Sequence, residues 1–198
     1  MILQLKYKGS IYLFPKSAAR DGSVVWYNEP MKRVAVLGCP GSGKTTFARK
    51  LAAKTGLPLI HLDFYYHQTE HDYLHNETAW TAKAKQLISQ DSWIMDGNYR
   101  STIDLRLKRA DTIIFFDFPR RKSLHGVIKR RIQYRNKRRE EMPSDWQEKA
   151  NLKFLLFVWR FRKNNRVKTL KAIEASSGKN IIMFTNRKQV NKYLSAVK

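Results

Sequence analysis

Acidic side chains are scarce in this sequence. Its 198 residues contain 16 Asp and Glu against 39 Lys and Arg, which gives a formal net charge of +23 at pH 7. A charge of this sign and size favours polyanionic partners, because it attracts them from solution. Charge alone does not choose between a nucleic acid, a membrane surface and phosphate groups bound inside the protein.

The sequence also contains a single cysteine and no long apolar run. Cys39 is the single cysteine, so an internal disulfide is excluded and a reducing compartment is indicated. No apolar run approaches the roughly 20 residues of a membrane-spanning helix. Apolar residues still make up 42% of the chain, which is enough for a sizeable core. We therefore expect a cytoplasmic protein with one globular domain and no membrane partner.

The first 30 residues stand apart from the rest. They contain short apolar patches, LQLKY, SIYLF and SVVWY, which are compatible with one or two strands or with disorder. We treat residues 1–30 as an N-terminal extension. Met31 lies just before the first clear strand and is the alternative translational start, so residues 31–198 are expected to form the single domain.

Apolar strands alternate with helices after this point. Residues 43–55 are expected to form a helix that ends at Gly56, and residues 77–89 a second one. The strands read VAVLG, LPLIHLD, SWIMDG, ADTIIFFDFP and NIIMFT. Near-continuous apolar strands that alternate with helices predict a parallel sheet covered on both faces. The expected fold is a doubly wound α/β domain with a five-stranded parallel sheet.

The segment GCPGSGKT, residues 38–45, fits the pattern G-x-x-x-x-G-K-[ST] between a strand and a helix. Glycines let successive backbone N–H groups point at phosphate oxygens, assisted by the helix N-terminus. Lys44 would reach the β- and γ-phosphates, and the Thr45 hydroxyl would hold Mg²⁺. The predicted nucleotide-binding residues are Gly38, Cys39, Pro40, Gly41, Ser42, Gly43, Lys44, Thr45 and Thr46.

The segment DGNYR offers a second clue. Asp96 ends the strand SWIMD, which places a carboxylate at the edge of the sheet where open α/β folds bind ligands. Such an aspartate can hold a Mg²⁺-bound water, and Arg100 can fork onto an anionic group of an acceptor. The competing interpretation is an ordinary turn at Asp96 and a solvated surface charge at Arg100.

Several separated motifs together resemble one family. VAVLGCPGSGKTTFARKLAAKTGLPLIHLD, SWIMDGNYRSTIDLRLKRADTIIFFDFPR, IKRRIQYRNKRREEMP and FLLFVWRFRKNNR occur in the order seen in adenylate-kinase-related P-loop proteins, often called DNA topology modulation proteins. The resemblance implies a P-loop NTPase/kinase fold, binding of ATP or GTP with Mg²⁺, and phosphoryl transfer. DGNYR takes the place of the D-G-x-P-R motif of adenylate kinases, where the Arg contacts the acceptor's phosphate, and Tyr99 replaces the proline.

Asp63 closes the strand LPLIHLD and matches the H-L-D motif of that family. In small-molecule kinases of similar layout an Asp here binds the acceptor hydroxyl or acts as a base, so the resemblance makes Asp63 the acceptor-side candidate. Its alternative role is that of a helix N-cap or turn residue.

His67, His71 and His75 recur every four residues and on a helix would share one face, which could indicate a metal site. The surrounding segment is poor helix material and lacks partner cysteines. We therefore favour a mobile acceptor-binding segment over a zinc site.

The segment LKFLLFVWRF has apolar residues on two sides of a helix. One stripe contains residues 152, 155, 156 and 159, and the other contains residues 154, 157, 158 and 161. A helix of this kind packs between layers of its own domain or pairs with a second chain. Core packing is the favoured interpretation, and a homodimer interface is the alternative.

The basic stretch from Arg120 to Arg139 holds ten Lys or Arg and no acid. On a helix, an inward face of Leu124, Val127 and Ile128 would continue through Arg131, Arg135 and Arg138. The opposite face would carry Lys122, Lys129, Arg130 and Lys137. Arginine suits bidentate phosphate contacts in a partly desolvated site. We therefore predict a helical lid near residues 120–145 that brings Arg131 and Arg135 over the transferring phosphate.

Two functions remain open. The first is an ATP-dependent phosphotransferase that acts on a nucleotide or another small molecule, with Lys44, Arg131, Arg135 and Asp63 as catalytic residues, Arg100 on the acceptor, and Thr45 and Asp96 on the metal. The second is a nucleic-acid-binding NTPase that influences DNA topology and uses the outward basic surface. The sequence names neither the acceptor nor the base of the donor, although TNRK at residues 185–188 is the expected neighbourhood of the base.

Overall fold

A computed structural model gives the structure of residues 31–68, 73, 75–135, 139, 141–143, 151–176 and 178–197, together with the backbone of two N-terminal strands. Those strands, β1 (Ile2–Tyr7) and β2 (Ser10–Pro15), pair antiparallel with each other as a separate two-stranded sheet.

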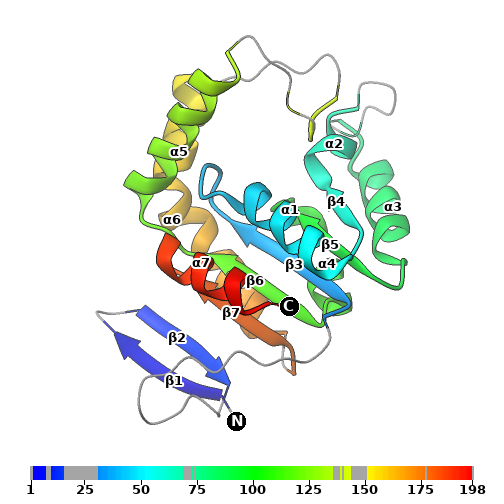
Figure 1. The fold of residues 1–198 in the computed structure, drawn as a ribbon. Coiled ribbons are helices and arrows are strands. Elements are labelled where there is room, and N and C mark those ends of the chain that lie inside the picture. Colours follow the sequence, from blue (N-terminus) through cyan, green and yellow to red (C-terminus); the bar gives the residue numbers. More distant parts are fainter. Residues whose placement is uncertain are drawn as a thin grey trace.

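The main sheet has five parallel strands, as predicted from the alternating pattern (Figure 1). Their spatial order is β4-β5-β3-β6-β7. The strands are β3 (Arg33–Gly38), β4 (Leu59–His61), β5 (Trp93–Asp96), β6 (Thr112–Phe116) and β7 (Asn180–Phe184). The central strand β3 is buried on both faces, which explains why its sequence is continuously apolar rather than alternating.

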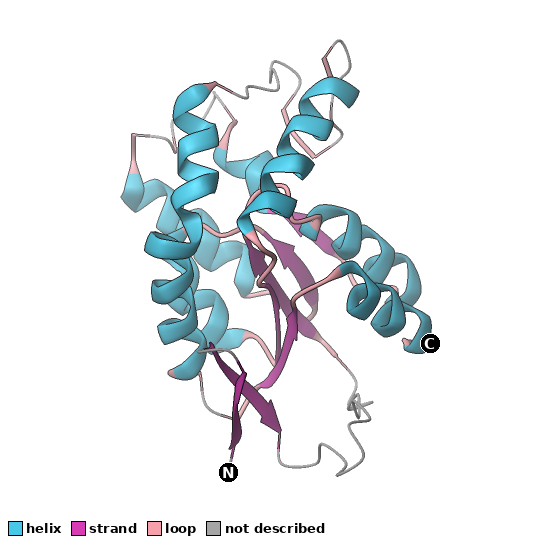
Figure 2. Cartoon of the chain, turned by 90° about the vertical axis from the view of Figure 1, so that its left-hand side faces the viewer, coloured by secondary structure: helices cyan, strands magenta, loops and turns pink. Residues whose placement is uncertain are grey.

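Helices cover both faces of this sheet (Figure 2). They are α1 (Lys44–Thr55), α2 (Leu62–Tyr66), α3 (Glu77–Ile88), α4 (Ile103–Arg109), α5 (Arg120–Gln133), α6 (Leu152–Glu174) and α7 (Arg187–Ala196), with the short 3-10 helix η2 (Arg100–Thr102) before α4. None of the helices in the described ranges is both long and apolar enough to cross a membrane.

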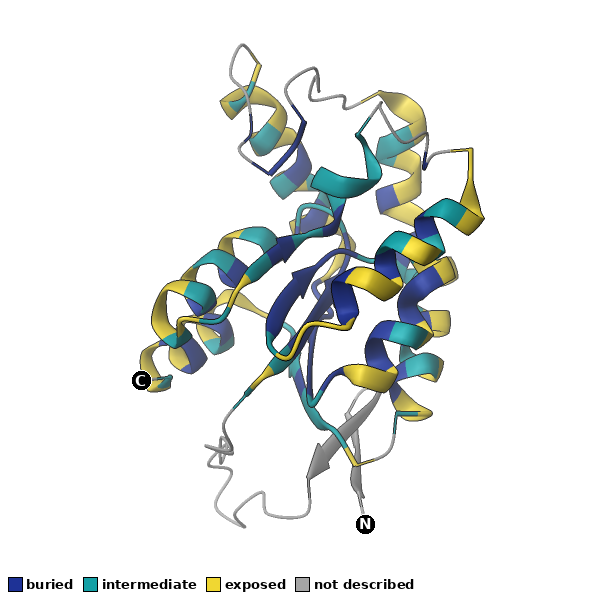
Figure 3. Ribbon diagram, turned by 90° about the vertical axis from the view of Figure 1, so that its right-hand side faces the viewer, coloured by how far each residue is buried: buried dark blue, intermediate teal, exposed yellow. Residues whose placement is uncertain are grey.

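Successive residues of β3 supply two separate cores, one on each face of the sheet. Val34 and Val36 pack with Phe47 of α1 and Tyr193 of α7. On the other face Ala35 and Leu37 belong to a cluster that includes Trp80 of α3, Leu107 of α4 and Ile173 of α6. This alternation follows from the two-residue period of a strand, and it leaves the strands as the most buried part of the molecule (Figure 3).

Local sequence signals set the ends of α1. Gly43 and Gly56 flank it with φ angles of 87° and 70°, in the left-handed region that side chains disfavour. The backbone N–H of Gly56 donates to the carbonyl of Ala52 and closes the last turn. The predicted helix over residues 43–55 is therefore confirmed to within one residue.

Each apolar stripe of α6 is packed only in part, with Leu155 packed in one and Phe157 exposed in the other. Val158 and Phe161 are buried in a small cluster with Cys39 and Val127, which joins α6 to α5 and the phosphate loop. The other stripe is exposed at Leu152, Leu156 and Trp159, with 71%, 42% and 44% of each residue accessible. Core packing thus accounts for half of the predicted pattern.

Candidate functional site

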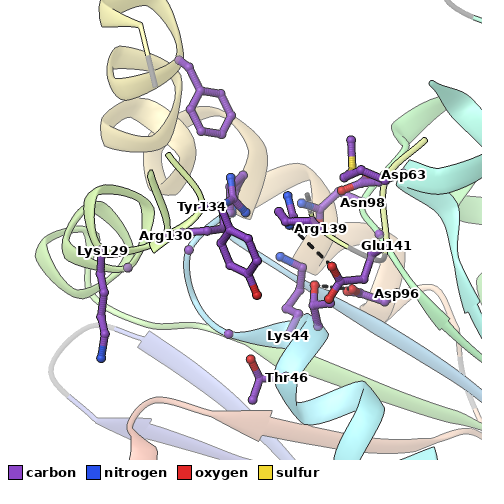
Figure 4. A pocket seen from close by; sticks show the side chains of 18 of the residues that line it. Lys44, Thr46, Asp63, Asp96, Asn98, Lys129, Arg130, Tyr134, Arg139 and Glu141 are labelled. Carbon is purple, nitrogen blue, oxygen red and sulfur yellow. Dashed lines mark hydrogen bonds and ion pairs between the residues drawn. The ribbon is translucent and has the colours of Figure 1, made fainter. Parts of the chain in front are cut away.

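A cavity of about 780 Å³ opens where the parallel strands end. Its walls come from the phosphate loop, the segment after β5, α2, α5 and the start of α6, and they also include Arg139, Glu141 and Met142 (Figure 4). This is the carboxyl edge of the sheet, where open α/β folds bind ligands. The cavity brings together Lys44, Thr45, Asp63 and Asp96, four of the residues predicted from the sequence.

The phosphate loop leads into α1 as its motif predicts. Its lining members are Pro40, Gly41, Gly43, Lys44, Thr45 and Thr46, whereas Gly38, Cys39 and Ser42 do not line the cavity. The Lys44 ammonium donates to the carbonyl oxygen of Cys39 at 3.0 Å. Burial lowers the pKa of Lys44, and the nearby Asp96 carboxylate opposes that change.

Cys39 serves packing rather than chemistry at the cavity. Its side chain is buried against α6, with Sγ 3.8 Å from the carbonyl oxygen of Val158. Burial raises the pKa of the thiol, so the reactive thiolate is disfavoured. Cys39 therefore acts as a small buried side chain that fills space between the phosphate loop and α6.

The side chains of Thr45, at the end of the phosphate loop, and Asp96, at the end of β5, are in direct contact. The Thr45 hydroxyl donates to Asp96 Oδ2 at 2.5 Å, and His61 Nδ1 lies 3.5 Å from the same oxygen. Burial alone would raise the pKa of Asp96, but His61, Lys44 and Thr45 together hold it below its ordinary value. Asp96 Oδ1 is buried without a hydrogen-bond partner, so an ionised oxygen is left for a ligand. A carboxylate beside a hydroxyl is a donor set that fits Mg²⁺.

Asp63 lies in the first turn of α2 and lines the cavity. Its Oδ1 accepts a hydrogen bond of 2.7 Å from the Tyr99 hydroxyl. It does not cap the helix, because His61 occupies the N-cap position. His67 ends the same helix and also lines the cavity, and burial lowers the pKa of its imidazole while Asp63 opposes that change.

The DGNYR loop is fastened by a residue that the sequence interpretation missed. Arg106 is fully buried and donates to the carbonyl oxygens of Gly97, Asn98 and Tyr99 at 2.8, 2.5 and 3.0 Å. Burial lowers the pKa of this guanidinium to about 10. The signal in the sequence was a lone basic residue on the apolar side of a short helix.

Arg100 begins η2 with an exposed side chain and is not among the residues that line the cavity. Instead Asn98 ties the loop to the phosphate loop: its Oδ1 accepts from the N–H of Gly38 at 3.0 Å, and its Nδ2 donates to the Gly38 carbonyl at 2.8 Å. Arg100 thus lies outside the cavity wall, and its contact with an acceptor stays a prediction.

The predicted inward face of α5 is confirmed at Val127 and Leu124, which pack in the cluster around Cys39, and is wrong at Ile128. The helix is packed through Ser123 and Val127, which are fully buried, whereas Ile128 is 49% exposed. The helix is therefore rotated about its axis relative to the predicted orientation. Arg130 lines the cavity, whereas Arg131 and Arg135 are exposed and do not line it. The remaining arginine of the predicted row, Arg138, falls outside the described residues.

Close packing of two glycines explains the rotation of α5. A Cβ at Gly126 would come within 2.0 Å of the Gly41 carbonyl oxygen, and one at Gly41 within 2.2 Å of the Ser123 carbonyl oxygen. Backbone contact between α5 and the phosphate loop therefore decides which face points inward. An argument from apolar side chains alone could not detect a contact made by residues without side chains.

Three further charged residues lie in the cavity, and the sequence interpretation missed all of them. Glu141 is buried and forms ion pairs with Arg49 of α1 and with Arg139, whose Nε is 3.6 Å from its carboxylate (Figure 4). The available signal was the acidic EEM between two strongly basic segments. It indicated a turn, but not that the turn lies over the phosphate loop.

The far side of the cavity is formed by the start of α7, within the segment expected near the nucleotide base. Arg187 lines the cavity, and its guanidinium lies 5.3 Å from the centre of the Phe118 ring. Burial lowers the pKa of Arg187. The side chain also crowds Gly43, where an added Cβ would lie 2.3 Å from it.

The histidine segment is described only in part. His67 lines the cavity, His75 is exposed, and His71 falls outside the described residues. Within the described part of the chain, no group of three or more His, Cys, Asp or Glu side chains is placed to hold a metal ion.

The sheet order, the phosphate loop and the Thr45–Asp96 pair define a P-loop nucleotide-binding α/β fold. No family model matches the chain. It is 30% identical over 106 residues to the adenylate kinase of Mycobacterium leprae (strain TN) and 32% identical over 106 residues to that of Mycobacterium marinum (strain ATCC BAA-535 / M). Each match covers 50% of this chain and 56% of the relative, so the chain spans about half the length of the curated relatives it matches.

Solved structures of kinases align with most of this chain at low similarity. A shikimate kinase from Bacteroides thetaiotaomicron aligns over 83% of this chain and 95% of its own, with 16% identity and a TM-score of 0.48. A gluconokinase from Sinorhizobium meliloti 1021 aligns over 83% and 87%, with 15% identity and a TM-score of 0.47.

Proposed function

We propose that this protein is an ATP-dependent phosphotransferase that acts on a small molecule. The observation that carries the proposal is one cavity that joins a complete phosphate loop to Asp63, a carboxylate fixed by the Tyr99 hydroxyl at 2.7 Å. A protein that only bound or hydrolysed ATP would not need a second, oriented carboxylate facing the same space. The mycobacterial relatives named adenylate kinase support transfer between small molecules.

The donor triphosphate would lie along the phosphate loop. Backbone N–H groups of residues 41–45 and the Lys44 ammonium would bind the phosphates, and Arg130 and Arg139 would neutralise charge that develops during transfer. Asp96 Oδ1 and the Thr45 hydroxyl would hold Mg²⁺. When bound, Mg²⁺ withdraws charge from the phosphate oxygens.

Asp63 would act on the acceptor. Its carboxylate would accept a hydrogen bond from the acceptor hydroxyl and take the proton as the new bond to phosphorus forms. Tyr99 would hold the carboxylate in place, and Arg139, Glu141 and Met142 would exclude water from the cavity.

Transfer of label from γ-labelled ATP tests the proposal. The protein should label at least one member of a panel of nucleosides, nucleotides and sugars in the presence of Mg²⁺. Lys44→Ala should reduce this transfer about 100-fold or more, because one electrostatic donor in a desolvated site commonly contributes that much. Lys85→Ala, at an exposed position of α3, is the control and should keep full activity. Hydrolysis that is stimulated only by DNA or RNA, with no labelled small molecule, would reject the proposal.

A second candidate, a nucleic-acid-dependent NTPase, rests on a different surface. Arg120, Arg121, Arg162 and Lys163 line a shallow cleft beside α5 and α6. The Arg120 guanidinium lies 4.6 Å from the centre of the Trp159 ring, which is partly exposed. Basic side chains next to exposed aromatic rings are typical of sequence-independent binding to single strands. Stimulation of hydrolysis that is lost in Trp159→Ala would favour this candidate.

A further inference from the structure

We propose that the acceptor is an uncharged molecule with hydroxyl groups, such as a nucleoside or a sugar, and not a nucleotide or another phosphate ester. This inference rests on the proposed phosphotransferase function and specifies its substrate class. It follows from how charge is distributed between the two ends of the cavity.

The segments at the carboxyl ends of β4 and β5 supply no cation among the described residues that line the cavity. The segments after β4 and β5 contribute Asp63, His67, Asp96, Asn98 and Tyr99 there. The lining Lys and Arg come from α1, α5, α7 and residue 139, which surround the phosphate loop. A phosphate monoester bound beside Asp63 would face its carboxylate, and the Lys44 ammonium that acts on Asp63 would already be bound to the donor phosphates.

Neither arginine near the DGNYR loop can replace the missing cation. Arg106 is fully buried, and its two terminal nitrogens are occupied by the carbonyl oxygens of residues 97–99. Arg100 is exposed and does not line the cavity. The position that contacts the acceptor phosphate in the D-G-x-P-R motif therefore has no guanidinium directed into this cavity.

Tyr99 instead builds a polar site for a hydroxyl. Its ring packs against Tyr66 and Trp80, with centroid distances of 4.5 and 5.0 Å, so its position is fixed. Its hydroxyl donates to Asp63, and a carboxylate accepts hydrogen bonds and donates none. The oxygen lone pairs of Asp63 that Tyr99 does not use can therefore accept a hydrogen bond from an O–H group of the acceptor. His67 beside it adds an imidazole whose pKa burial lowers, so the neutral form is favoured near neutral pH.

The proposed step is balanced with ATP as the co-reactant. The acceptor oxygen forms a bond to the γ-phosphorus, and the bond between that phosphorus and the β–γ bridging oxygen breaks. ADP leaves with the bridging oxygen and its electron pair. The hydroxyl proton moves to Asp63, so a neutral alcohol becomes a phosphate ester without any redox change.

Matched pairs of acceptors test the inference directly. The wild-type protein would be incubated with Mg²⁺, γ-labelled ATP and adenosine or AMP, cytidine or CMP, and glucose or glucose 6-phosphate. We expect label on an uncharged member and at least 100-fold less on its phosphorylated partner. Label on a phosphorylated member at an equal or higher rate would overturn the inference but keep the proposed function. If no member is labelled, the proposed function fails, and this inference fails with it.

Asp63→Asn gives an independent readout on the acceptor that is labelled. With an uncharged acceptor, loss of the base should lower kcat about 100-fold or more while KM does not improve. With an anionic acceptor, removal of one negative charge should lower KM at least several-fold, and that result would contradict the inference. Asp104→Asn, at an exposed position of α4, should leave both parameters unchanged.

Tyr99→Phe separates positioning from a merely structural role. The ring and its packing against Tyr66 and Trp80 stay, while the hydrogen bond to Asp63 is lost. We expect a fall in kcat of about 10-fold with an unchanged melting temperature, because the carboxylate loses its fixed orientation. Unchanged kcat would show that Tyr99 does not position Asp63.

Discussion

At the scale of single residues, two arginines six positions apart have opposite roles. Arg106 is fully buried and binds three backbone carbonyls of the DGNYR loop, whereas Arg100 is exposed on η2. The motif directs attention to Arg100, because its place in the pattern is that of a substrate ligand. In the structure it is Arg106 that holds the DGNYR loop, through its hydrogen bonds to the loop carbonyls.

This contrast gives a prediction on stability. Arg106→Met should lower the free energy of unfolding by about 3 kcal/mol or more, because buried carbonyls lose charge-assisted hydrogen bonds. Arg100→Met should change it by less than about 0.5 kcal/mol, as expected for an exposed side chain. Urea denaturation of both variants provides the measurement. Equal effects of the two substitutions would show that the carbonyl contacts of Arg106 contribute little.

At the scale of one element, the orientation of α5 decides which arginine faces the donor. The helix contacts the phosphate loop through Ser123, Gly126 and Val127, whereas Ile128 is 49% exposed. Successive residues of a helix point in directions that differ by about 100° around its axis. The same basic sequence therefore presents Arg130 to the cavity and Arg131 to its outside.

Two neighbouring alanine substitutions test this orientation. Arg130→Ala should lower kcat/KM for phosphoryl transfer about 10- to 100-fold, through loss of a cation beside the transferring group. Arg131→Ala should stay within about twofold of the wild type, because it removes the same charge from outside the cavity wall. Initial rates at varied ATP concentration give the comparison. A larger loss in Arg131→Ala would restore the face predicted from the sequence.

At the scale of the whole molecule, the strand order assembles the site. β3 lies between β5 and β6, and β4 flanks β5, so three loops distant in sequence meet at one edge of the sheet. The phosphate loop follows β3, Asp96 ends β5, and Asp63 follows β4. Binding of a ligand at this edge should therefore stabilise the entire domain.

Thermal unfolding with and without Mg²⁺ tests that coupling. ATP with Mg²⁺ at 100 times its Kd should raise the melting temperature by about 5–10 °C, because a ligand that binds the folded state adds about 2.7 kcal/mol of stability. Asp96→Asn should lose the part of this shift that depends on Mg²⁺ and keep the part given by ATP alone. Asp104→Asn should behave as the wild type. An intact Mg²⁺-dependent shift in Asp96→Asn would exclude Asp96 as a metal ligand.

The sequence predicted the elements that depend on local chemistry. Apolar strands, the helix stop at Gly56 and the pattern GCPGSGKT all follow from residues close together in the chain, and the five-stranded parallel sheet is confirmed. The Thr45–Asp96 contact could also be anticipated, because parallel strands bring their carboxyl ends to one edge. These signals are strong because each depends on backbone conformation or on a repeated apolar pattern.

The residues that only the tertiary structure identified are Arg49, Arg106, Arg130, Arg139 and Glu141. Their roles depend on how elements pack together, as for the ion pair between Arg49 and Glu141 and the backbone contact between Gly126 and Gly41. By itself, the sequence determined the sheet, the phosphate loop and the charge of the chain. The tertiary structure alone decided which charges enter the cavity, because the rotation of a helix is set by packing, and no local pattern encodes it.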